Sequence, residues 1–242
     1  MSTYNPIGIS SIHYKHTELG AAMEEIDGWE MPARYSSPQN EIDAAKRSVV
    51  VGDISFKGKF IVHSQIVDTH QLDSFLGENL PQVLRASTTR LSLNKNLSDV
   101  VLVRLASDEI LVLTNCNDRD VVSKILTSNS GECIHTVDVT SSLAGLSILG
   151  PSSHFLLSEL TEIDISSDAF PNMVCAQGKV ADIAATILRC DHDGLPGFEV
   201  YFARDFGEYM WETFIRSGQT YNAIPIGFKG MNSLGVQCVA TF

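Results

Sequence analysis

The chain has 242 residues, a length that accommodates one large domain or two small ones. Apolar residues make up 44% of the chain and charged residues 19%, which excludes a disordered, collagen-like or coiled-coil protein and indicates a substantial core. With 17 basic and 29 acidic residues the net charge is −12, so we expect neither a nucleic-acid partner nor binding to an anionic membrane.

The cysteines and the N-terminus bear on the cellular compartment. The five cysteines are odd in number and widely spaced, without a CxxC pair, which is typical of reduced thiols. No basic segment followed by an apolar one opens the chain, and Arg104, Asp108 and Glu109 interrupt the apolar stretch between residues 100 and 114. We therefore expect a cytoplasmic protein without a membrane span.

Strand-like and helix-like segments follow one another along the whole chain. Apolar spacing and caps predict helices over residues 18–28, 41–48, 65–75, 117–126, 205–216 and 227–236, with Asn117 as the cap of the fourth. Runs of β-branched and aromatic residues predict strands over residues 60–62, 99–105, 110–114, 137–139, 146–149, 183–189 and 198–202.

The mixture of elements predicts an α+β fold rather than a doubly wound sheet, because no strict βαβ alternation occurs. The order strand, helix, hairpin, helix, strand occurs about twice. We therefore expect one unit over residues 1–242 with two ferredoxin-like halves, approximately 50–140 and 141–235.

A hairpin places the first candidate site residue. The turn at residues 106–109 joins two apolar strands, so Asp99 should lie opposite the segment Asn115-Cys116-Asn117. A carboxylate at this open end, if partly desolvated, suits a proton acceptor or a partner for a cation. The alternative is a solvated or turn-capping aspartate, and the residues alone favour it.

Glu199 is the second candidate. It follows a polar loop and alternates with Phe198 and Val200, so it faces away from the apolar side of its strand. A carboxylate there can accept two parallel N–H bonds from a planar heterocycle, although an exposed strand glutamate is the common alternative. The pattern Asp191-His192-Asp193 lacks a second ligand cluster, and we interpret it as a turn rather than a metal site.

Seven segments together resemble the glycine-cleavage T-protein family, the tetrahydrofolate-dependent aminomethyltransferases. The first and most distinctive is Gly28-Trp29-Glu30-Met31-Pro32-Ala33-Arg34-Tyr35-Ser36-Ser37, which resembles that family's "GWxMPxxYss". The others follow in the same order and cover residues 41–55, 93–103, 113–117, 146–151, 189–201 and 226–236. These motifs are weak singly and specific together.

The resemblance implies a folate-binding fold with the pterin of tetrahydrofolate held in a central cavity. The family's catalytic aspartate corresponds to Asp99, its pterin-binding glutamate to Glu199 and its hairpin asparagine to Asn115. It also implies that the cofactor-binding residues include Val101, Val103, Asn117 and Tyr201. Asp99 would then orient or protonate the folate nitrogens during one-carbon transfer.

Several departures from the family pattern bear on activity. Ser98 stands where the family has the first of two aspartates, and Met231-Asn232 replaces its "RD". The family also continues past the length of this chain into a C-terminal barrel domain, which we expect to be lacking here.

Two functional hypotheses follow from the resemblance. The first is an enzyme that transfers a methyl or other one-carbon group between a small donor and tetrahydrofolate, as demethylases and aminomethyltransferases of this superfamily do. The second is a non-catalytic folate-binding subunit, or an iron–sulfur assembly-type factor, whose partner protein supplies the C-terminal domain. Lys229-Gly230-Met231 lacks the cysteine of the assembly-factor motif, which disfavours the last variant. The residues do not identify the donor.

Overall fold

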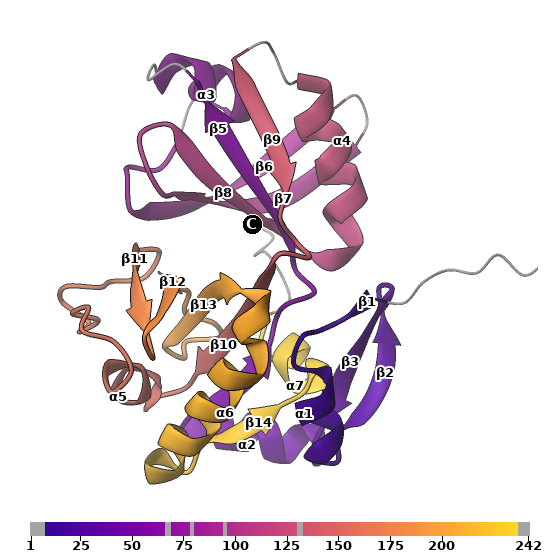
Figure 1. The fold of residues 1–242 in the computed structure, drawn as a ribbon, viewed down its shortest axis with the longest axis vertical. Coiled ribbons are helices and arrows are strands. Elements are labelled where there is room, and N and C mark those ends of the chain that lie inside the picture. The colour runs from indigo at the N-terminus through magenta and orange to yellow at the C-terminus, as the bar shows by residue number, and fades with distance from the viewer. Residues whose placement is uncertain (1–7, 66–68, 78–79, 94–95, 130–132, 237–242) are drawn as a thin grey trace, which may run out of the picture.

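The computed structural model describes residues 8–65, 69–77, 80–93, 96–129 and 133–236. It contains three sheets (Figure 1). The five-stranded sheet is antiparallel, with the order β6-β7-β8-β5-β9. Its strands are β5 (Gly58–Ser64), β6 (Arg85–Leu93), β7 (Asn96–Arg104), β8 (Glu109–Thr114) and β9 (Ile134–Asp138).

The six-stranded sheet has the order β11-β12-β13-β10-β4-β14 and is antiparallel except between β14 and β4. Its strands are β4 (Val50–Asp53), β10 (Leu143–Leu149), β11 (Cys175–Val180), β12 (Ile183–Arg189), β13 (Gly197–Ala203) and β14 (Ile224–Ile226). A small third sheet consists of β1 (Gly8–Ile9), β2 (Ala22–Ile26) and β3 (Trp29–Arg34).

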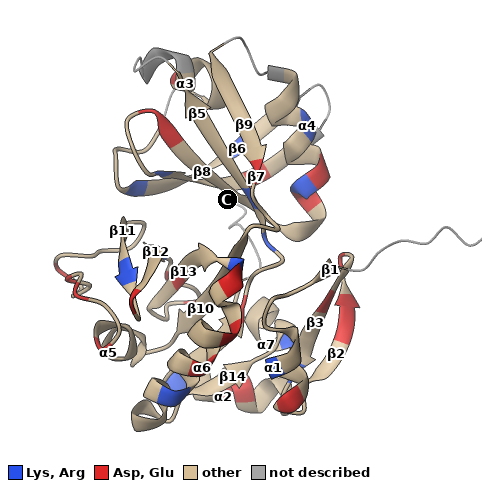
Figure 2. Cartoon of the chain, in the orientation of Figure 1, with Lys and Arg blue, Asp and Glu red and all other residues tan. Residues whose placement is uncertain are grey.

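The α-helices are α1 (His13–Glu18), α2 (Pro38–Arg47), α3 (Thr69–Leu76), α4 (Arg119–Asn129), α5 (Ser153–Ser158), α6 (Gly207–Ser217) and α7 (Phe228–Ser233). Short 3₁₀ helices are η1 (Cys116–Asp118), η2 (Arg204–Phe206) and η3 (Gly218–Tyr221). Among the described helices, none combines the length and apolar character needed to cross a bilayer. The two large sheets are mostly uncharged, and charged residues gather on helices, turns and outer strands (Figure 2).

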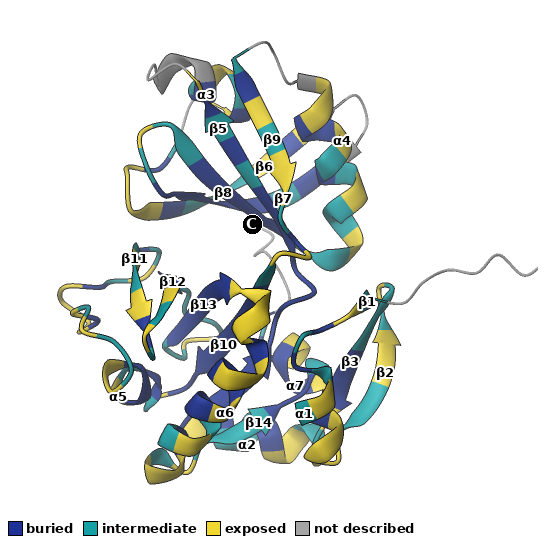
Figure 3. Ribbon diagram, viewed as in Figure 1, coloured by how far each residue is buried: buried dark blue, intermediate teal, exposed yellow. Residues whose placement is uncertain are grey.

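Each large sheet has one face toward helices and the other toward the opposite sheet. On the five-stranded sheet, Val100 and Leu102 pack with α3 and α4, and on the six-stranded sheet Phe198 and Phe202 pack with α6, one side of which is buried (Figure 3). The residues that alternate with these along each strand point toward the opposite sheet. A third apolar cluster joins the two sheets and includes Val101, Val103, Leu113, Leu188 and Tyr201. Each of the two large sheets therefore contains a strand that is buried on both faces.

A buried glutamate holds α7 beside this inner layer. Glu41 on α2 is fully buried; its Oε1 accepts the N–H groups of Tyr35 and Ser36, and its Oε2 accepts the N–H of Gly227. A Cβ at Gly227 would collide with the backbone of Ala33, so glycine is required at this close approach. These bonds fix the start of α7 and hence the segment that follows it.

The α+β fold and the hairpin of β7 and β8 are confirmed. The helix expected over residues 18–28 is wrong, because α1 ends at Glu18 and residues 22–26 form β2, paired with β3. The helix cap expected at Asn117 is also wrong, since Asn117 lies inside η1 and Asn115 is the residue that precedes η1.

Candidate functional site

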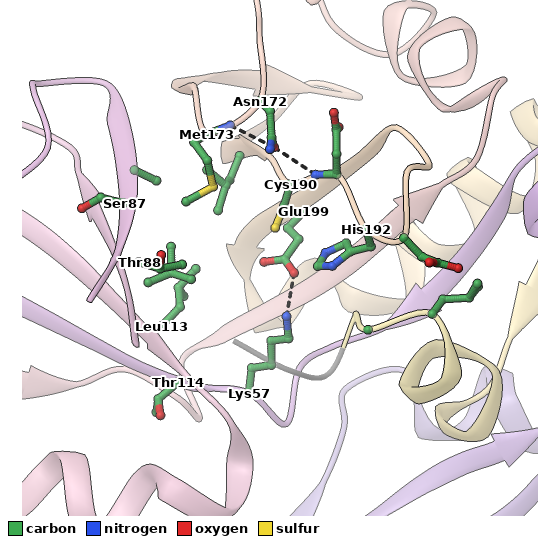
Figure 4. A pocket seen from close by; sticks show the side chains of 17 residues that line it. Lys57, Ser87, Thr88, Leu113, Thr114, Asn172, Met173, Cys190, His192 and Glu199 are labelled. Atoms are coloured by element: carbon green, nitrogen blue, oxygen red, sulfur yellow. Dashed lines mark hydrogen bonds and ion pairs between the residues drawn. The ribbon is translucent and has the colours of Figure 1, made fainter. Parts of the chain in front are cut away.

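A cavity of about 620 Å³ lies between the two large sheets. One wall comes from β6, β7 and β8, and the other from β12, β13 and the loops around residues 172 and 192 (Figure 4). Apolar side chains dominate both walls, namely Ala86, Val101, Leu113, Met173, Leu188 and Leu234. Such a space suits a flat, largely apolar ring system with a polar edge.

Glu199 supplies a buried negative charge on the cavity wall. Phe198 and Val200 point to the helix side of β13, so Glu199 points to the inner side, as the alternation predicts. The residue is only 2% exposed, which overturns the reading of an ordinary solvated strand glutamate. A carboxylate buried this deeply requires partners, because desolvation of an unpaired charge is costly.

Two partners stabilise the Glu199 carboxylate. Lys57, from the loop between β4 and β5, donates from Nζ to Glu199 Oε1 at 2.6 Å. The Tyr201 hydroxyl donates to Oε2 at 2.5 Å. Burial acts to raise the pKa of Glu199, but the positive charge of Lys57 and these hydrogen bonds outweigh it and hold the pKa below its ordinary value. Glu199 is therefore ionised at neutral pH.

The Lys57 loop is itself held by a buried lysine. Lys59 is completely buried, and its Nζ donates to the carbonyl oxygens of Ser55 and Lys57 at 2.7 and 2.8 Å. Burial lowers the pKa of Lys59 to about 7. Sequence patterns missed both lysines, because a Lys-Gly-Lys segment ordinarily indicates a solvated turn.

Cys190 and His192 lie beside Glu199, in the loop between β12 and β13. The donor atoms of these three side chains lie within 4.8 Å of one another, and His192 Nε2 is buried without a hydrogen-bond partner among the described residues. Burial lowers the pKa of His192 to about 4 and raises that of Cys190 to about 12, so both are neutral at pH 7. A metal ion would have to displace the Lys57 ammonium from Glu199, so the set fits a polar organic edge better than a cation.

Asp99 lies inside β7, two residues before Val101 and on the same face of the strand, but it is not among the residues that line the cavity. Its carboxylate forms a bidentate pair with Arg90 on β6, with Nε–Oδ1 and Nη2–Oδ2 distances of 2.6 and 3.0 Å. The hydrogen bond and charge of Arg90 lower the pKa of Asp99. Val100 pairs with Thr114, and continuing this register by one residue places Asn115 beside Asp99.

Of the remaining residues predicted from the sequence, some lie at the cavity and others do not. Val101 lines the cavity, whereas Val103 packs in the inner apolar cluster next to it. Tyr201 is buried and reaches the site through Glu199. Asn117 is exposed and lines a different cavity, together with Arg119, so the structure does not bring it to the cavity of Glu199.

A second buried polar cluster stabilises the fold rather than forming a catalytic site. Ser10 Oγ and His16 Nε2 both bond Asp53 Oδ2, at 2.5 and 2.9 Å, and His16 Nδ1 bonds the Tyr35 hydroxyl at 2.7 Å. The serine contacts the aspartate rather than the histidine, so His16 cannot activate it as in a Ser-His-Asp triad. The cluster ties the N-terminal segment to β4.

Residues 12–238 match the family model described as the GCVT N-terminal domain. The chain belongs to this family. Its curated relatives include the aminomethyltransferase of Streptomyces coelicolor, 28% identical over 227 residues, which are 92% of this chain and 60% of that protein. The aminomethyltransferase of Halothermothrix orenii is 24% identical over 226 residues, covering 92% of this chain and 62% of the relative.

Solved structures show the same fold. The glycine cleavage system aminomethyltransferase T from Bartonella henselae has a TM-score of 0.81 at 17% identity and covers 98% of this chain and 64% of its own. A chain of the heterotetrameric sarcosine oxidase from Corynebacterium sp. U-96 has a TM-score of 0.61 at 14% identity. The match covers 77% of this chain and 93% of the oxidase chain. The resemblance to the T-protein family is thus confirmed, and the chain spans about 60% of the length of the curated relatives named above.

The exchange of the family arginine for Met231 has a packing explanation. Met231 on α7 is 1% exposed and belongs to the inner apolar cluster. Its sulfur fills the space where a Cβ on Gly52 would stand. Met231 therefore fills space in the core of this chain.

Proposed function

We propose that this chain binds tetrahydrofolate in the cavity between the two large sheets and transfers a one-carbon group to or from it. One observation carries the proposal: the buried, ionised carboxylate of Glu199 stands beside Lys57 on the wall of a cavity whose lining also includes Val101, Leu113 and Leu188. Membership of the GCVT family and the printed activity of its aminomethyltransferase relatives support the same ligand class.

The proposed ligand matches the cavity in shape and polarity. A pterin is a flat ring system whose 2-amino and ring N–H groups point the same way, and a carboxylate accepts such a pair in parallel. Each oxygen of an ionised carboxylate accepts more than one hydrogen bond, so the bonds from Lys57 and Tyr201 leave acceptor capacity on Glu199. The faces of the ring would pack against Val101, Leu113 and Leu188.

Asp99 would act as a fixed negative charge. Because Arg90 lowers its pKa, Asp99 is ionised at neutral pH and is a poor proton donor. An anion near the folate nitrogens would orient them and stabilise positive charge that develops as the one-carbon unit moves. Asn115, adjacent in the strand register, would help to orient the same part of the ligand.

The donor would be a small methyl or one-carbon compound. A second candidate is a folate-binding subunit that acts with a partner protein, and the bidentate Arg90–Asp99 pair favours it because Arg90 already neutralises the carboxylate. The two candidate functions differ in whether this chain catalyses one-carbon transfer without a partner protein.

Titration calorimetry with tetrahydrofolate under nitrogen tests the proposal. We expect saturable binding of one ligand per chain, and an absence of binding at millimolar concentration would contradict it. The complex would then be incubated with sulfonium, aryl methyl ether and methylamine donors, and chromatography would detect 5-methyltetrahydrofolate, the product of methyl transfer without an oxidant. Binding without product from any donor supports the subunit candidate, and product formation excludes it.

A further inference from the structure

Lys57 presents a charged hydrogen-bond donor to the same cavity as Glu199. Its side chain is 9% exposed and lines the cavity, and Figure 4 shows it and Glu199 pointing toward one another. An ammonium group carries three N–H donors. Among the described residues, the hydrogen bond from Lys57 Nζ goes to Glu199 Oε1, so donor capacity remains for a ligand.

We propose that Lys57 donates to the ring carbonyl of a bound 2-amino-4-oxo heterocycle while Glu199 accepts from the adjacent N–H groups. The inference rests on the proposed function and deepens it, because it assigns recognition of the 4-oxo group to Lys57.

The argument is one of complementary hydrogen-bond patterns. The edge of a pterin presents an amino donor, a ring N–H donor and a carbonyl acceptor in a row. The 2.6 Å pair offers the matching row of two carboxylate acceptors and one ammonium donor. The Tyr201 hydroxyl holds the Glu199 carboxylate, and Lys59 holds the backbone of Lys57 through its carbonyl oxygen. Both contacts exist before a ligand arrives, which reduces the cost of ordering the site.

The same geometry disfavours a 4-amino ring. In that ring an amino donor replaces the carbonyl, so it would face the Lys57 ammonium and leave one of the ammonium N–H groups without an acceptor. The ring nitrogen next to it also loses its hydrogen, so Glu199 would lose one of its two donors. Sites that bond a polar group of the substrate reject analogues lacking it far more strongly than apolar pockets reject a change of size. Apolar lining residues such as Val101 and Leu113 offer no hydrogen bond that would distinguish the two rings.

The test compares tetrahydrofolate with 4-amino-4-deoxytetrahydrofolate by titration calorimetry on the full chain. We expect the unmodified protein to bind the 4-oxo ligand at least about 30-fold more tightly, and Lys57→Met to reduce this ratio at least about tenfold. Lys57→Arg keeps donors in the cavity and should keep most of the preference. Lys124→Met, at an exposed position of α4, is the matched control and should leave the ratio unchanged.

The outcomes separate this inference from the proposed function. Tetrahydrofolate binding with the same ratio in the unmodified protein and Lys57→Met overturns the role of Lys57 and leaves the folate proposal standing. If Lys57→Met does not fold, equal affinity of the unmodified protein for both ligands overturns the inference by itself. Guanosine carries the same edge of amino, ring N–H and carbonyl groups as a pterin. Binding of guanosine without binding of tetrahydrofolate would therefore overturn the folate proposal and support recognition of this edge by Lys57 and Glu199. Binding of none of them overturns both.

Discussion

Lys57 and Glu199 are 142 residues apart in the chain, yet they form a 2.6 Å ion pair on the wall of the inner cavity. The lysine comes from the loop that leads into the five-stranded sheet, and the glutamate from the six-stranded sheet. The pair therefore connects the six-stranded sheet to the loop that leads into the five-stranded sheet, at the point where the ligand is proposed to bind. It also keeps a buried carboxylate ionised, which an apolar environment would otherwise oppose.

The substitution Glu199→Gln tests the binding role of this carboxylate. Glutamine keeps the size but replaces one acceptor with a donor and leaves Lys57 unpaired, so tetrahydrofolate affinity should fall about 10- to 100-fold, equivalent to a charged hydrogen bond. Titration calorimetry measures the affinity. Glu208→Gln, at an exposed position of α6, is the control. An affinity within about twofold of the unmodified protein would remove Glu199 from the binding site.

Asp99 is expected to affect turnover more than binding. The variant Asp99→Asn keeps the shape of the side chain but removes the charge proposed to stabilise the transferring group, so turnover should fall about 100-fold or more. The dissociation constant of tetrahydrofolate should change less than about fivefold. Single-turnover kinetics with any active donor separates the two quantities, and Asp168→Asn on an exposed turn serves as the control. Equal losses of affinity and turnover would instead assign Asp99 to ground-state binding.

Local patterns predicted the parts of the site that lie on one hairpin or one strand. The turn at residues 106–109 correctly predicted the pairing of β7 with β8, and period-two alternation correctly predicted that Glu199 and Phe198 face different sides of β13. Neither the hairpin nor the strand alternation predicts that Lys57 pairs with the Glu199 carboxylate. Lys57 lies in the loop between β4 and β5, far from Glu199 in the sequence, and its role depends on how the two large sheets pack together.

The same reason explains the errors in secondary structure. Met23 and Ile26 are three residues apart, a spacing that fits one face of a helix and also occurs in a short edge strand. Pairing with β3 decides in favour of β2, and this pairing is not visible in a window of eleven residues. Asn117 is a good cap by residue type, but η1 begins before it and displaces the start of α4 to Arg119.

Lys59 should give the protein a distinctive pH dependence of stability. Its pKa is about 7 in the folded protein and 10.5 ordinarily, so between these values the unfolded chain binds more protons and stability rises with pH. Lys59→Met removes this contribution. From pH 7 to pH 10 the free energy of unfolding of the unmodified protein should therefore gain up to about 4 kcal/mol relative to the variant.

Urea denaturation of both proteins at several pH values, under reducing conditions, measures this difference. Taking the difference cancels the titration of cysteines and tyrosines common to both proteins. Lys46→Met, at an exposed position of α2, should show a pH-independent difference. A difference that stays constant for Lys59→Met would mean that the ammonium of Lys59 is as well solvated in the folded protein as in the unfolded chain.

Asp53 should contribute to stability only while it is ionised. It is fully buried, and although burial acts to raise its pKa, the bonds from His16, Ser10 and Ser55 lower it below the ordinary value of 3.8. Asp53→Asn breaks this network and should reduce the free energy of unfolding at pH 7 by about 3 kcal/mol. A group with a lowered pKa loses its contribution as the pH falls through the folded value, so the deficit of the variant should shrink below pH 4. Thermal unfolding between pH 3 and 7 checks both statements, with Asp205→Asn at an exposed position as the control. A deficit that persists unchanged at pH 3 would show that the amide disrupts packing rather than charge.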